Sequence, residues 1–237
     1  MMTFKRAHAI RPFLVLSAIC VVSSGTFAQT NLIINGSFEL PILTPGSDFL
    51  TAPVGGAVIP GWSVVGASGQ NVAVIEALYN LPDAAGINFA AADGVQWIDM
   101  AGVGINSTEG VLQSVPLPAD TYNLSFSVGN VVAAAAGLGT QSTINLRING
   151  VLAQSFTNTG AGGGAVNWQR FSYTFAGSGS TSIEFRSGDG VSDNLNGLDN
   201  VVLVAVPEPS STITLLLGLT FGALCLRRTS QRSRGEA

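Results

Sequence analysis

Short alternating runs of apolar and polar residues dominate the middle of the chain, and helical spacing is scarce there. In the clearest run, 142–148, Ile144, Leu146 and Ile148 fall on one face of an extended strand. Asn149-Gly150 follows and favours a type I′ hairpin turn, because both of its central residues need positive φ. The pattern predicts strands over residues 31–35, 57–65, 71–78, 94–100, 109–115, 121–130, 141–148, 151–157, 168–176, 181–187 and 198–205.

Turn signals separate these short strands, which is typical of an antiparallel β-sandwich. The sequence therefore predicts one all-β domain over residues 29–205, with 206–210 as a linker. A chain of that length buries about 70% of its extended surface, which is enough for a sizeable core.

The N-terminus predicts a signal peptide over residues 1–28. Lys5, Arg6 and Arg11 form a positive region, the apolar run 13–22 follows, and small residues frame a cleavage site at 26–28. Positive residues also lie on the cytoplasmic flank of the C-terminal apolar run, so both ends place the middle of the chain outside the cytoplasm.

The C-terminus has three parts in order. The motif consists of Val206, Pro207, Glu208 and Pro209, the apolar run 211–226 carries no charge, and Arg227 and Arg228 follow it. The two prolines end any regular element. The sixteen apolar residues span about 24 Å as a helix, and the arginines can extend toward the interface and complete a transmembrane helix.

This tail resembles the PEP-CTERM sorting signal of Gram-negative bacteria. The resemblance implies processing near the motif by an exosortase-type membrane protease. It also implies an inner-membrane-anchored precursor that ends in the cell envelope, on the outer surface or secreted. Such proteins accompany exopolysaccharide production and biofilm formation. A simple C-terminal membrane anchor is the alternative, and it gives the same side of the membrane.

Composition excludes several functions for residues 29–205. Three arginines against twelve acids give a net charge near −9, which disfavours nucleic acid and suits divalent cations. The single histidine, His8, and both cysteines, Cys20 and Cys225, lie in the terminal segments, and the middle has no lysine. This excludes a disulfide, a thiolate nucleophile, a Ser-His pair and a zinc site with nitrogen or sulfur ligands.

Several motifs in order are similar to those of galactose-binding-like jelly rolls, which include many carbohydrate-binding modules. They are an Asn-Gly-x-Phe-Glu opening at 35–39, Pro-Gly-Trp at 60–62, the runs 94–100 and 111–115, and the closing run 197–203. The resemblance implies a jelly roll with its first and last strands side by side. It also implies a structural calcium held by Glu39 and Asp199, both oxygen ligands of the kind that calcium prefers. The alternative is that these acids are exposed or cap turns.

Aromatic residues are the candidates for a sugar platform: Trp62, Trp97, Trp168, Tyr79 and Tyr122. Their positions in the pattern place the tryptophans in the core and leave Tyr79, at a strand end, as the best exposed ligand-binding candidate. The acidic stretch 189–196 lacks the spacing of an EF-hand loop and is interpreted as a solvated turn.

Carboxylate pairs are the remaining acid–base chemistry, which restricts catalysis chiefly to glycoside hydrolysis. No spacing pairs the candidate acids Glu76, Asp93, Asp99, Glu109 and Glu184, and Asp99 and Glu184 are expected to face solvent. The sequence thus predicts an exported, noncatalytic cell-envelope or matrix protein that can bind polysaccharide. The alternatives are a dedicated carbohydrate-binding module and a glycoside hydrolase.

Overall fold

The computed structural model describes most of the middle of the chain. The described residues are 29–46, 49–79, 86–103, 108–132, 138–160, 164–189 and 195–207. The predicted signal peptide, the sorting motif beyond Pro207, the apolar run 211–226 and the basic tail lie outside them. Within these ranges, no helix has the length and apolar character to span a bilayer.

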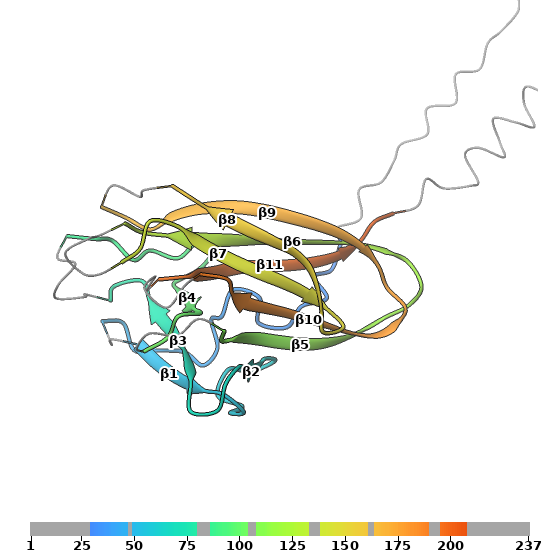
Figure 1. The fold of residues 1–237 in the computed structure, drawn as a ribbon, viewed down its shortest axis with the longest axis horizontal. Helices are drawn as coiled ribbons and strands as arrows, with labels where there is room; N and C mark the ends of the chain where they lie inside the picture. The colour runs from blue at the N-terminus through green and yellow to red at the C-terminus, as the bar shows by residue number, and fades with distance from the viewer. Residues whose placement is uncertain are drawn as a thin grey trace, which may run out of the picture.

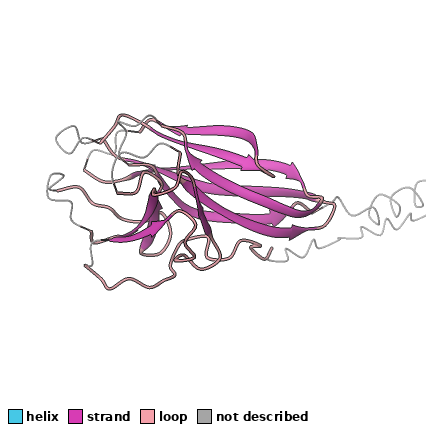
Figure 2. Ribbon diagram, turned by 60° about the horizontal axis from the view of Figure 1, so that its bottom comes forward, coloured by secondary structure: helices cyan, strands magenta, loops and turns pink. Residues whose placement is uncertain are grey.

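The described chain is a sandwich of two antiparallel sheets (Figures 1 and 2). The six-stranded sheet has the order β1-β3-β4-β11-β6-β9. Its strands are β1 (Phe49–Pro53), β3 (Asn71–Glu76), β4 (Gln96–Asp99), β11 (Gly197–Ala205), β6 (Thr121–Asn130) and β9 (Asn167–Ala176).

The five-stranded sheet has the order β2-β5-β10-β7-β8. Its strands are β2 (Ser63–Val65), β5 (Gly110–Leu117), β10 (Gly179–Ser187), β7 (Ser142–Ile148) and β8 (Val151–Asn158). The predicted fold class, an all-β antiparallel jelly-roll sandwich, is confirmed.

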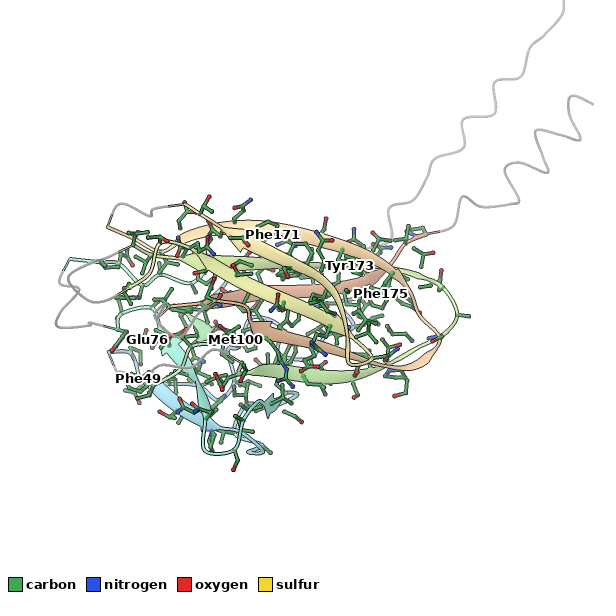
Figure 3. All side chains as sticks on the ribbon, viewed as in Figure 1. Phe49, Glu76, Met100, Phe171, Tyr173 and Phe175 are labelled. Atoms are coloured by element: carbon green, nitrogen blue, oxygen red, sulfur yellow. The ribbon has the colours of Figure 1, made fainter. Side chains whose placement is uncertain are left out.

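The core lies between the sheets and is built from alternate strand positions, as the period-2 pattern requires. On β6, Leu124 and Phe126 are fully buried, whereas Ser125 between them points to the outer face and is half-buried. The neighbouring edge strand β9 places a row of three half-buried aromatic side chains against this core (Figure 3). They are Phe171, Tyr173 and Phe175.

The opening segment differs from the prediction, because residues 31–35 are not a strand. The Asn31 side chain takes the place of a ladder partner, with Oδ1 accepting the N–H groups of Ile33 and Leu203. Asn35 then turns the chain with φ of 54°. A strand that the alternation did not predict, β1, lies further along the chain at Phe49–Pro53.

The first strand, β1, is not a neighbour of the last strand, β11, as the resemblance implied, but the irregular opening segment does lie beside β11. The Leu32 N–H donates to the Leu203 carbonyl at 2.9 Å, and the Val201 N–H donates to the Gly36 carbonyl at the same distance. Gly36 is needed here, since a Cβ atom would lie 2.1 Å from the Val201 oxygen. The hairpin turn is confirmed, with φ of 52° at Asn149 and 77° at Gly150.

The connections sort to the two ends of the sandwich. The last residues of β11, the β5–β6 turn and the β9–β10 turn share one end, where the Val206 N–H donates to the Thr121 carbonyl. The β6–β7, β8–β9 and β10–β11 connections share the other, which we call the loop end (Figure 1). Anything bound at the loop end is therefore distant from the point where the chain leaves toward its C-terminus.

Candidate functional site

A second apolar cluster covers the outer face of the six-stranded sheet at the loop end. Five aromatic rings form a continuous row there, with neighbouring ring centroids 5.5–6.5 Å apart. In order they are Phe49, Tyr79, Phe89, Trp97 and Trp168. The middle rings, Phe89 and Trp97, are buried, while the end rings Phe49 and Trp168 keep part of their surface exposed. The row therefore reaches the surface at its ends.

The segment 86–96 covers this row and is held by backbone bonds. The Asn88 N–H donates to the Gly164 carbonyl, and the Asn88 carbonyl accepts from Val166, so the segment pairs with the start of β9. Two indole N–H groups fix it from below, Trp97 to the Phe89 carbonyl and Trp168 to the Ala90 carbonyl, each at 2.8 Å.

Asp199 holds the same segment from the sheet. Its Oδ2 atom accepts the N–H groups of Ala92 and Asp93 at 2.8 and 2.9 Å, and its Oδ1 atom accepts that of Asn200. The side chain is fully buried, and burial raises its pKa to about 8, with the charge of Asp93 adding to the rise and the three N–H groups opposing it. This carboxyl therefore acts as an internal anchor and cannot reach a ligand.

Glu39 holds the next two residues of the segment. Its Oε1 atom accepts the N–H groups of Val95 and Gln96 at 2.9 and 2.8 Å. Gly94 makes room for it, because a Cβ atom at that position would lie 2.3 Å from the same oxygen. The two predicted calcium ligands thus grip adjacent parts of one segment.

The contacts of Glu39 and Asp199 bear on the calcium predicted between them. Five backbone N–H groups, rather than carbonyl oxygens, face three of the four carboxylate oxygens. In the described ranges, no group of three or more acid, histidine or cysteine side chains gathers for a metal. The surroundings fit an amide-binding anchor better than a cation site, and calcium at this pair stays a prediction.

Tyr79, the predicted ligand-binding residue, belongs to the aromatic row. Its ring is half-buried, edge-on to Phe49 at 5.7 Å and tilted against Phe89 at 5.5 Å. The partly exposed Phe49 beside it means that this end of the row could present aromatic surface to a ligand. Trp62 and Trp97 are buried, as expected, with their indole N–H groups bound to backbone carbonyls.

Trp168 lies differently from the other tryptophans. Trp168 on β9 is paired with Gly129 on β6, and Gly129 is paired with Gly197 on β11. The indole on the outer face therefore lies next to two glycines on the adjoining strands. A Cβ atom at Gly129 would lie 2.7 Å from Cζ3 of the indole, and one at Gly197 would lie 3.0 Å from Cη2. The six-membered ring therefore rests directly on the sheet, and the half-buried side chain keeps part of its surface accessible.

Arg170 follows Trp168 by two residues and so shares its face. It is exposed and donates from Nη2 to Ser125 Oγ at 2.7 Å. Both ion pairs among the described residues involve Glu184, so Arg170 forms none within them. The other four guanidinium N–H groups can thus serve a ligand beside the indole. We use the name β9 face for Trp168 and Arg170 of β9 together with Ser125 and Ser127 of the neighbouring strand β6.

The acids considered for catalysis are engaged elsewhere. Asp99 and Glu184, expected to face solvent, are instead buried with 6% and 4% exposure, because loops and long side chains cover the outer faces. Asp99 accepts backbone N–H groups from Ala101 and Asn196, and burial raises its pKa to about 7. Glu184 binds Arg147 and Arg186.

Glu76 and Glu109 are buried as well, at 4% and 1% exposure. Glu76 accepts the N–H groups of Gly46 and Leu78, and Glu109 accepts the backbone N–H and the hydroxyl of its neighbour Thr108. Asp93 is exposed and accepts from the Ser37 hydroxyl at 2.6 Å. These contacts describe structural acids rather than an acid–base pair across a cleft.

Comparison with known proteins adds the following. No family model matches the chain, and no curated protein matches it. Among solved structures, it is similar to a family 61 carbohydrate-binding module in complex with β-1,4-galactotriose, with a TM-score of 0.46 and 17% identity over 75% of this chain and 100% of that one. A family 35 module from Clostridium thermocellum has a TM-score of 0.42 and 12% identity, over 68% and 100% of the two chains.

A xylan-binding domain from Paenibacillus barcinonensis has a TM-score of 0.39 and 15% identity, over 70% and 99% of the chains. The enzymatically active domain of a bacteriophage CBA120 tailspike is also similar, with a TM-score of 0.40 and 14% identity over 74% of this chain and 21% of the tailspike chain. These are likenesses of chain path at low identity.

The β9 face was not predicted from the sequence. Trp168 was placed in the core because it starts an alternating aromatic strand, and Arg170 was not considered. The phase of β9 carries the signal, since Trp168 and Arg170 alternate with the core row at 171, 173 and 175 and so must face outward. The glycines beneath the indole could not be assigned without strand pairing.

Proposed function

We propose that this chain is an exported, noncatalytic protein of the cell envelope or extracellular matrix whose sandwich binds carbohydrate at the β9 face. The observation that carries the proposal is the indole of Trp168 resting on Gly129 and Gly197 with Arg170 on the same face. Ligand sites combine an aromatic surface with a few fixed polar groups, and a sugar ring offers a flat C–H face together with hydroxyls at its rim.

The arrangement is fixed before a ligand arrives. The Trp168 indole N–H is bound to the Ala90 carbonyl, its edge meets Trp97 at 81°, and its inner face contacts glycine backbone. Arg170 is oriented by Ser125. A preorganised aromatic surface loses little rotamer freedom on binding, so more of the contact energy appears as affinity.

Position supports the same proposal. The β9 face starts at the loop end, whereas the chain leaves the sandwich at Val206 on the opposite end. A protein held by its C-terminal segment during sorting would thus carry the β9 face away from the membrane. The exosortase-type protease, the inner-membrane precursor and the matrix setting belong to the proposal through the sequence motif alone.

A glycan array tests the binding. Wild-type protein is applied to neutral and acidic polysaccharides, together with Trp168→Ala and a matched control, Tyr173→Ala, which removes an aromatic from the inner face of the same strand. Binding by the wild type that weakens at least tenfold in Trp168→Ala, a loss of about 1.4 kcal/mol, and survives in the control supports the proposal. Absence of binding to every polysaccharide would contradict it.

A further inference from the structure

A buried polar cluster joins the two sheets at the loop end. It contains Asp99 from the end of β4, Asp189 just after β10 and Asn196 just before β11, with 6%, 6% and 0% exposure. The backbone N–H of Asn196 donates to Asp99 Oδ1, and its Nδ2 donates to Asp189 Oδ2, each at 2.9 Å. Asn196 is thus the residue that connects the two acids.

One buried acceptor of this cluster is unsatisfied. Asn196 Oδ1 is fully buried and has no hydrogen-bond partner among the described residues. The amide orientation is fixed, because Nδ2 faces a carbonyl of Thr143 at 2.7 Å and the Asp189 carboxylate, and both of these only accept. Leaving a buried acceptor unsatisfied costs about 1–3 kcal/mol, so a group that attracts oxygen should stand at Oδ1.

The charges limit what that group can be. Asp99 is engaged by two backbone N–H groups and is buried, which is costly for an ionised carboxylate. The three arginines of residues 29–205 have described contacts elsewhere, two with Glu184 and one with Ser125. No lysine or histidine occurs in that range. A water molecule could satisfy Oδ1 but would add no positive charge.

We infer that a hard divalent cation of the calcium type binds between Asp99, Asp189 and Asn196. The side-chain ligands are all oxygens, two of them carboxylate groups, which is the set that calcium takes and zinc does not. Such an ion would join β4 and β11 of one sheet to the end of β10 in the other and close both ends of the 189–196 connection. This inference goes beyond the proposed carbohydrate binding and does not depend on it.

Asp189 and Asn196, the ends of the stretch interpreted as a solvated turn, are both buried, while residues 190–194 lie outside the described residues. The site is also separate from the calcium predicted at Glu39 and Asp199, whose described contacts lie in segment 92–96 and at Asn200. Substitution can therefore distinguish the two.

Calcium binding to the detergent-solubilised full chain, measured by calorimetry after removal of metal with EDTA, tests the inference. The wild type is expected to bind one calcium ion in this cluster. Asp189→Asn and Asp99→Asn should each weaken that binding at least tenfold, whereas the matched control Asp120→Asn, at the opposite end, should leave it unchanged. Loss of binding in Asp199→Asn with retention in both cluster variants would overturn the assignment, as would a wild type that binds no calcium.

A second measurement needs no variant and therefore does not depend on whether the variants fold. Hydrogen exchange of the wild type, with calcium and with chelator, is expected to show calcium-dependent protection of amides at 99–101, 143 and 196. Protection confined to 92–96 would instead place the ion at Glu39 and Asp199. Unchanged exchange throughout would leave a buried water as the partner of Asn196 and overturn the inference.

Discussion

Trp168 lies on Gly129, its register partner on β6, so that the indole takes the space that a side chain would occupy. The same ring contacts the position of Gly197 on the next strand. Two glycines in neighbouring strands normally weaken a sheet, and here they admit an aromatic surface. The two glycines therefore lower the intrinsic strand stability at this point and, in exchange, make room for the indole of the proposed ligand site.

Gly129→Ala is therefore expected to displace the indole. The new Cβ atom would lie 2.7 Å from Cζ3 of the ring, so the variant should lose about 1–3 kcal/mol of unfolding free energy and most of its carbohydrate affinity. Urea unfolding followed by tryptophan fluorescence, together with the glycan array, measures both. Ser172→Ala, on the exposed face of β9, is the control and should behave as wild type. Full affinity in Gly129→Ala would remove Trp168 from the site.

The pH dependence of stability follows from Asp99 and Asp199. Burial raises their pKa values to about 7 and about 8 from the ordinary carboxyl value of 3.8, so the folded state binds these protons more tightly than the unfolded state. Stability is thus complete below about pH 4 for these groups and falls as pH rises toward 8, by up to about 1.4 kcal/mol per pH unit for each proton. Asp93 faces Asp199 and strengthens the effect.

Urea unfolding from pH 4 to 9 in the presence of chelator measures this slope. Asp99→Asn keeps an oxygen for the N–H groups of Ala101 and Asn196 while removing the titrating proton. It is expected to flatten the decline below pH 7 and leave the part due to Asp199. An equal slope in wild type and variant would show that Asp99 does not titrate in this range.

Two substitutions of Glu39 distinguish the loss of its hydrogen-bond acceptor from the loss of its charge. Glu39→Ala removes the acceptor of the Val95 and Gln96 N–H groups and should lower the unfolding free energy by about 1–3 kcal/mol. Glu39→Gln keeps an Oε1 acceptor and should change it by about 0.5 kcal/mol or less. Thermal unfolding with chelator present compares the two. A Gln variant as unstable as the Ala variant would show that the charge is needed, as the calcium prediction requires.

Sorting is tested by the mass of the mature protein in its host. Glu208 lies in the predicted motif and Glu236 in the basic tail, so the two Glu→Gln variants carry the same chemical change in different contexts. Glu208→Gln is expected to accumulate as a membrane-bound precursor, while Glu236→Gln should lose its C-terminal segment near 206–209, as wild type does. Retention of the C-terminal segment in the wild type and in both variants would favour a simple membrane anchor, and cleavage of both variants alike would show that Glu208 is not needed for processing. The same spectra show whether cleavage also follows Ala28.

The presence of most strands could be predicted because the alternation of apolar and polar residues depends only on neighbouring positions in the sequence. The Asn149-Gly150 turn and the core face of β9 followed from the sequence for that reason. The segment 31–35 failed because Asn31 replaces ladder bonds with side-chain bonds to Leu203, a residue far along the chain. Asp99 and Asp189 are buried although the sequence predicts them at the surface. Their burial depends on other elements that cover them, which no local pattern shows.

The sequence by itself determined the all-β class and the absence of histidine, cysteine and lysine from residues 29–205, and it alone carries the prediction of a signal peptide and a sorting tail, since each depends on composition or on neighbouring residues. Only the tertiary structure decided that Trp168 rests on two glycines, that Asp199 holds the 86–96 segment and that Asn196 links Asp99 to Asp189. These relationships join residues up to about a hundred positions apart. They depend on strand order and register, which the long-range packing of the two sheets fixes and which no local pattern encodes.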